Sequence, residues 1–186
     1  MFFGNDENAQ KIWSQNTGVF WGHHQTAYEF SGKMEKIGNI CQEIFHLGQV
    51  GCMNPRILIV PSEVSFEILT KKLQSAFHKF WGKALHRTWV HSAQRYQETM
   101  KPFCTNTSSP SSLPWISEVP RKYTNLLTHH GGDYFGVFLL RYKNKAELEL
   151  IKKDLLPTLT YKTDQENTQF QIWNGRHLGK PLFCPE

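Results

Sequence analysis

The chain has 186 residues, of which 39% are hydrophobic and 20% are charged, and its formal net charge is +5. These values predict one ordinary soluble domain over residues 1–186, long enough to bury a real core. No stretch approaches the roughly 18 apolar residues of a membrane-spanning helix. We therefore expect no membrane span. The basic residues are scattered along the chain and form no patch in the sequence, so we expect no nucleic-acid partner.

The four cysteines are Cys41, Cys52, Cys104 and Cys184. Their irregular spacing, without a Cys-x-x-Cys pair, argues against a zinc ribbon and against a disulfide-stapled scaffold. Because no signal peptide precedes the predicted fold, we expect a cytoplasmic protein with free thiols. The adjacent His23 and His24 have no cysteine or carboxylate at ligand spacing, so no metal site is predicted.

The N-terminal part of the chain has a weak pattern. Residues 6–13 predict a short helix and residues 17–21 a strand, whereas residues 28–36 are ambiguous between elements.

A stretch around Cys52 is much better defined. Asn39 predicts a helix N-cap, with Gln42 at capping-box spacing, and Gly48 predicts the end of that helix. Residues 57–60 form a continuous apolar run that is typical of a buried strand. Cys52 is therefore expected on a short loop between a helix and a strand, where glycine lets other groups approach closely.

The next segments differ sharply in character. Ser62 predicts the N-cap of a helix that runs to about residue 81. Its apolar face is formed by Phe66, Leu69, Leu73, Phe77 and Phe80. Residues 101–125 are rich in proline, serine and threonine and predict a long polar loop, either a lid or an insertion.

The C-terminal third alternates strands and a helix. Residues 136–142 predict a strand, and Asn144 with Glu147 has the capping-box spacing of a helix that ends before Pro157. Residues 158–163 predict one more strand, and residues 175–186 an irregular tail. Strands alternating with amphipathic helices predict an α/β fold with a mixed or mostly parallel sheet flanked by helices.

The loop motif Gly48-Gln49-x-x-Cys52-x-x-Pro55-Arg56 resembles the catalytic-cysteine segment of the aldehyde dehydrogenase superfamily. Within that superfamily the chain is most similar to the fatty acyl-CoA reductases of bacterial bioluminescence. They share a Val-x-x-Trp-Gly type of segment, here at residues 18–22, and an approach to the C-terminus like residues 175–182. The resemblance implies an α/β fold like the catalytic domain of aldehyde dehydrogenases.

The resemblance also implies a reaction. Cys52 would be the nucleophile that takes an acyl group from acyl-CoA or another acyl thioester, and hydride from NADPH would reduce the acyl-cysteine to an aldehyde. Asp133 and Phe135 stand where the family carries a cofactor-binding Glu-x-Phe-Gly-Pro motif, although the acid here is Asp and the proline is missing. Glu29 begins a segment similar to the general-base motif Glu-Leu-Gly-Gly-Lys, but it lies nearer to Cys52 than the family allows.

The resemblance leaves three readings open. The family binds its cofactor on an N-terminal dinucleotide domain that has no counterpart here, so a partner chain supplying that domain, and an oligomer, are expected. The alternatives to a reductase domain are a non-catalytic remnant or assembly module of the same fold, and a cysteine acyltransferase. In all three, Gln49 and Arg56 are expected to shape the loop rather than take part in chemistry.

Overall fold

The protein is described from a computed structural model. The structure describes residues 25–45, 49, 54–81, 99–109, 112–124, 126–127, 136–155, 159–163 and 171–173. Several predicted features lie outside these residues: the helix at 6–13, the strand at 17–21, the two adjacent histidines and the tail at 175–186.

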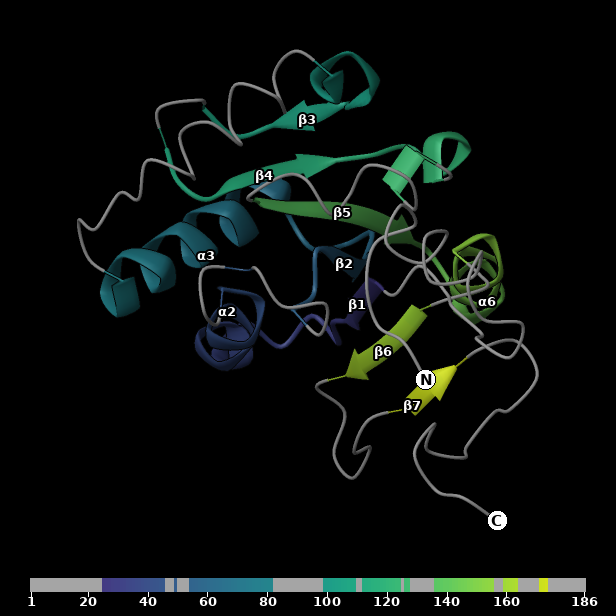
Figure 1. The fold of residues 1–186 in the computed structure, drawn as a ribbon, viewed down its shortest axis with the longest axis horizontal. Helices are drawn as coiled ribbons and strands as arrows, with labels where there is room; N and C mark the ends of the chain where they lie inside the picture. The colour runs from purple at the N-terminus through teal and green to yellow at the C-terminus, as the bar shows by residue number, and fades with distance from the viewer. Residues whose placement is uncertain are drawn as a thin grey trace, which may run out of the picture.

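The described residues form one seven-stranded sheet with the order β3-β4-β5-β2-β1-β6-β7 (Figure 1). The strands are β1 (Gln25–Glu29), β2 (Ile57–Pro61), β3 (Asn106–Thr107), β4 (Trp115–Glu118), β5 (Gly136–Tyr142), β6 (Leu159–Thr163) and β7 (Gln171–Trp173). The five central strands pair in parallel, and β3 and β7 add to the two edges antiparallel. The predicted mixed, mostly parallel α/β sheet is therefore confirmed.

Helices cover both faces of this sheet (Figure 1). On one face α2 (Ile37–Phe45) packs against α3 (Phe66–Trp81), and α6 (Lys145–Asp154) covers the other face. Strand β2 is buried throughout and divides its side chains between the two layers: Leu58 and Val60 join the α2–α3 core, while Ile57 and Ile59 join the α6 core. A continuous apolar run is expected of a strand covered on both faces.

Of the three predicted helix N-caps, one is correct and two are wrong. Asn144 caps α6, since its side chain accepts a hydrogen bond from the Glu147 N–H at 2.9 Å. The predicted cap of α3 at Ser62 is wrong, because residues 62–64 form a turn and Ser65 Oγ instead accepts the N–H of Ile68. Helix α2 likewise begins before the predicted cap at Asn39, because a 3₁₀ turn (Met34–Lys36) leads directly into it.

The prediction of one long polar loop over residues 101–125 is wrong. That segment contains β3 and β4, which are joined by hydrogen bonds from the Thr105 N–H to the Glu118 carbonyl and from the Ser108 N–H to the Ile116 carbonyl. Strand β4 forms because its short apolar core, Trp115 and Ile116, is buried beside β5. Strands β1 and β7 were also not predicted.

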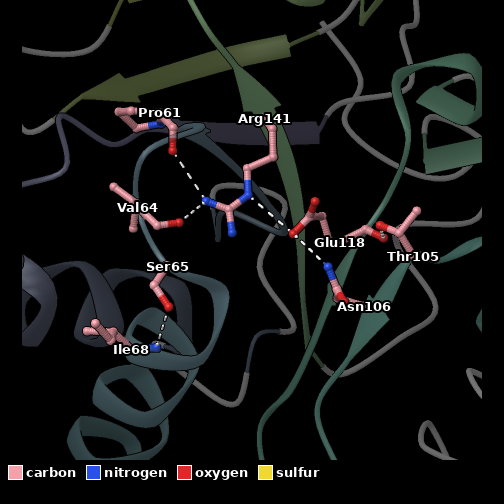
Figure 2. Close-up of polar contacts among 8 residues, drawn as sticks. All are labelled: Pro61, Val64, Ser65, Ile68, Thr105, Asn106, Glu118 and Arg141. Carbon is pink, nitrogen blue, oxygen red and sulfur yellow. Dashed lines mark hydrogen bonds and ion pairs between the residues drawn. The ribbon is translucent and has the colours of Figure 1, made fainter.

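An arginine joins the carboxyl ends of β2, β4 and β5 (Figure 2). Arg141 donates from Nε to the Glu118 carboxylate at 3.3 Å, and from Nη1 to the carbonyls of Pro61 and Val64. The Arg141 and Glu118 side chains are only 17% and 20% exposed. The turn between β2 and α3 is thus fastened to the sheet by a charged group in addition to the apolar packing of Val64 in the α2–α3 core.

Candidate functional site

Two chain segments enter the sheet side by side at the amino ends of β2 and β5. In the parallel register Ile57 lies opposite Phe138, and the Phe138 N–H donates to the Arg56 carbonyl at 2.8 Å. The segment that leads into β2 carries Cys52, and the segment that leads into β5 carries Asp133 and Phe135. The topology therefore brings the ends of these two segments, at Arg56 and Gly136, to the amino ends of two neighbouring strands.

Gln49 bridges these two segments directly. Its side chain Nε2 donates to the Gly136 carbonyl at 2.8 Å and to the Pro55 carbonyl at 3.3 Å, and the Gly136 N–H donates to its Oε1 at 2.9 Å. Gln49 is 1% exposed and has φ of 63°, in the left-handed region that non-glycine residues seldom occupy. Such an unfavourable conformation persists only where the surroundings hold it.

Glycine is the one residue type that allows β4 to pack so closely against position 136. A Cβ at this position would lie 2.5 Å from the carbonyl oxygen of Trp115 on β4, closer than real Cβ contacts occur. Trp115 is also the register partner of Gly136. Strand β4 therefore lies against β5 at the same residue, Gly136, that the Gln49 amide contacts. The glycine thus permits close packing of backbone rather than a special φ angle.

The other flank of the cysteine segment is anchored as well. The Asn54 side chain, 7% exposed, donates to the Glu43 carbonyl in α2 at 2.9 Å. Arg56 Nη2 donates to the Gln49 carbonyl at 2.6 Å, and the Arg56 N–H donates to the Thr26 carbonyl on β1. Gln49 and Arg56 therefore shape the loop through backbone contacts, as the sequence predicted.

The three predicted site residues, Cys52, Asp133 and Phe135, lie outside the described residues, so their roles stay predictions. What sequence reasoning missed is the contact between Gln49 and Gly136. Both residues belong to motifs that the sequence singled out, but no local signal pairs two positions separated by 87 residues.

Glu29, which begins the segment similar to a general-base motif, forms an ion pair. It ends β1 at the carboxyl edge of its strand, and its carboxylate lies 2.8 Å from Lys152 Nζ on α6. Both side chains are mostly buried, with 14% and 19% exposed. The ion pair ties α6 to the sheet at the carboxyl end of β1, whereas Arg56 lies at the amino end of β2.

Two other cysteines are described, and both are free thiols. Cys41 lies in α2 and is 0% exposed, and burial raises the pKa of its thiol to about 12. Cys104 is half-buried, and its Sγ lies 3.3 Å from the Met100 carbonyl.

We expect Cys41 to resist alkylation in the folded protein. Its thiol is removed from solvent and stays protonated at neutral pH, whereas alkylation requires the thiolate. Iodoacetamide at pH 8 followed by peptide mass spectrometry should leave Cys41 unmodified until urea unfolds the chain. Rapid labelling of Cys41 under native conditions would contradict the buried placement.

The described part of the chain lacks two other kinds of feature, a metal-ligand cluster and a membrane-spanning helix. No group of three or more histidine, cysteine, aspartate or glutamate side chains gathers there in a way that would hold a metal ion. Among the same residues, every helix is too short or too polar to cross a bilayer.

Comparison with known proteins gives a likeness of fold. No protein-family model matches the chain, and no curated protein matches it. Solved structures do match. They include γ-glutamyl-γ-aminobutyraldehyde dehydrogenase from Burkholderia cenocepacia J2315, at 10% identity with a TM-score of 0.57, over 86% of this chain and 38% of that one.

Two more matches agree with the first. Methylmalonate-semialdehyde dehydrogenase from Oceanimonas doudoroffii is 10% identical, with a TM-score of 0.54, over 78% of this chain and 36% of that one. An aldehyde dehydrogenase from Bartonella henselae is 10% identical, with a TM-score of 0.55, over 92% and 48%. The chain thus has the α/β fold of aldehyde dehydrogenases, as predicted, and spans less than half the length of each of these structures.

Proposed function

We propose that the chain is an acyl-thioester reductase domain of the aldehyde dehydrogenase type, with fatty acyl-CoA as the acyl donor and Cys52 as the nucleophile. The observation that carries the proposal is the hydrogen-bonded bridge between Gln49 and Gly136. It joins the segment with the proposed nucleophile to the segment with the proposed cofactor contacts. The aldehyde dehydrogenase fold supports the same reaction class.

The proposed chemistry begins with thioester exchange. The Cys52 thiolate attacks the carbonyl carbon of the acyl-CoA, a new C–S bond forms, and the CoA thiolate leaves with the electron pair of the broken C–S bond. The oxyanion formed on the way needs preorganised donors, for which the main-chain N–H of Cys52 is the candidate. The acyl-cysteine has an energy similar to that of the starting thioester, so the step is reversible.

The cofactor assignment follows from the resemblance. When bound, NADPH would supply the hydride for reduction of the acyl-cysteine to an aldehyde, and the Cys52 thiolate would be the leaving group. Asp133 and Phe135 are the proposed contacts to the cofactor, and Gln49 holds the residue that follows them, Gly136. The proposal includes a partner chain that carries the dinucleotide-binding domain and a cytoplasmic location, where thiols stay reduced.

Intact-mass spectrometry tests the nucleophile. The purified chain is incubated with a long-chain acyl-CoA beside two variants, Cys52→Ala and the matched control Cys104→Ala. We expect one acyl adduct on the wild type and on Cys104→Ala, and complete loss of the adduct in Cys52→Ala. Circular dichroism confirms that each variant is folded.

The alternatives appear as distinct outcomes. A cysteine acyltransferase would give a different result. NADPH and candidate partner chains would then leave the Cys52 adduct unreduced, and the acyl group would pass to another acceptor. No adduct on the folded wild type would leave the non-catalytic remnant or assembly module of the same fold.

A further inference from the structure

Gln49 occupies a backbone conformation that suits a different residue. Glycine or asparagine normally takes the left-handed region, because a longer side chain is disfavoured there. Gln49 nevertheless has φ of 63° and is buried almost completely. A glutamine in this position indicates that its side chain contributes something that offsets the unfavourable backbone.

The side chain provides a paired donor and acceptor. Its amide makes two hydrogen bonds to Gly136, one to the carbonyl at 2.8 Å and one from the N–H at 2.9 Å. In a parallel ladder the N–H and C=O of Gly136 would bond to two different residues of the neighbouring strand, and here one side-chain amide satisfies both groups. The backbone ladder between β2 and β5 is already formed at Phe138, so the Gln49 amide extends the pairing of β5 toward its amino end.

We propose that Gln49 is a positioning residue, which fixes the start of the cysteine segment to the start of β5 so that both segments keep one spacing. This inference rests on the proposed function, because the spacing matters only if Cys52 and the residues before Gly136 act on one substrate. Gln49 contacts the main chain of Gly136 and Pro55 and acts on the reaction through the Cys52 segment.

Two substitutions separate hydrogen bonding from bulk and charge. Gln49→Met keeps a similar length and loses both bonds to Gly136. Gln49→Glu keeps them while the carboxyl is protonated, since its O–H then replaces the N–H donor, and loses the donor when it ionises. Burial against two carbonyl oxygens favours the protonated carboxyl. The guanidinium of Arg56, which contacts the main chain of residue 49, favours the ionised carboxyl instead. Among the described residues it is the charged side chain in contact with this position.

A matched control is available on α3. Gln74 donates from Nε2 to the carbonyls of Ser112 and Pro114, both at 3.4 Å, so its contacts are also to main-chain carbonyl oxygens. Gln74→Glu makes the same chemical change away from the cysteine segment. Circular dichroism and thermal unfolding of every variant are measured at each pH used.

The readout is the rate of Cys52 acylation by long-chain acyl-CoA between pH 5.5 and pH 8.5, divided by the wild-type rate at the same pH. We expect Gln49→Met to be at least tenfold slower at every pH. Gln49→Glu should approach the wild-type rate at pH 5.5 and fall at least fivefold as pH rises, while Gln74→Glu stays within twofold. A merely structural role would not give a pH-dependent ratio in a variant that remains folded.

Failure of this inference is distinguishable from failure of the proposed function. If Gln49→Met is folded and acylates within twofold of the wild type, or if the Gln49→Glu ratio is flat, the positioning role is wrong although Cys52 is a nucleophile. If Gln49→Met does not fold, the Gln49→Glu profile decides. If the wild type takes no acyl group, the proposed function fails. The rate of Cys52 alkylation by iodoacetamide then tests whether Gln49 positions the Cys52 segment. A rate in Gln49→Met that differs at least threefold from the wild-type rate supports positioning, and an unchanged rate overturns it.

Discussion

Replacing Gly136 with alanine is expected to lower the free energy of unfolding by about 3 kcal/mol, a severe loss for a domain of this size. The new Cβ would lie 2.5 Å from the main-chain oxygen of Trp115, and backbone atoms cannot rotate away as a flexible side chain can. Relief of this overlap requires β4 to separate from β5. The two hydrogen bonds between Gly136 and Gln49 would be displaced as well.

Urea unfolding followed by circular dichroism measures this loss. Gly38→Ala is the matched control, because Gly38 lies in α2 and its Cβ would meet only the ring of Phe80, at 4.0 Å. Alanine has the higher helix propensity, so Gly38→Ala should be neutral or more stable by about 0.5 kcal/mol. Equal stability of the two variants would disprove the close approach of β4 to Gly136.

Replacing Arg141 with methionine is expected to destabilise the protein by about 2 kcal/mol. Methionine keeps much of the apolar stem but leaves the Pro61 and Val64 carbonyls and the Glu118 carboxylate without the guanidinium (Figure 2). The cost is below that of breaking a fully buried ion pair, because the Arg141 and Glu118 side chains keep partial contact with water. Arg141→Lys should recover part of the loss, since an ammonium group carries the charge but cannot reproduce the fork of donors.

The control for the charge itself is Arg121→Met. Arg121 pairs with Asp154 at 2.6 Å, but both side chains are well exposed, and exposed ion pairs contribute little to stability. We expect its urea midpoint to stay close to that of the wild type. If Arg121→Met and Arg141→Met lose the same stability, then the fastening of the β2–α3 turn by Arg141 contributes no more than a surface charge.

The proposed site and the Gly136→Ala variant meet in one structural feature. Gly136 lies between Trp115 on β4 and the Gln49 amide, so the residue that permits close strand packing also receives the bridge from the cysteine segment. Damage to either side of Gly136 is therefore expected to disturb both the sheet and the proposed chemistry. The positioning experiment on Gln49 tests the second of these effects without creating a backbone overlap.

Much of the fold was predictable because its signals are local. The apolar spacing of Leu69, Leu73 and Phe77 specifies the buried face of α3, and all three are buried as predicted. The Asn144 cap lies three residues from its partner. The continuous apolar runs of β2 and β5 likewise indicate strands that are covered on both faces. Such patterns follow from the periods of helix and strand and need no knowledge of the neighbouring elements.

The sequence by itself determined the α/β class, the principal helices and the candidate cysteine motif, because backbone periodicity and short motifs operate over a few residues. Only the tertiary structure decided that β4 is a strand, since its four residues become strand by pairing with β5. Only the tertiary structure joined Gln49 to Gly136, because a hydrogen bond between positions 87 residues apart depends on the parallel register that sets β2 beside β5.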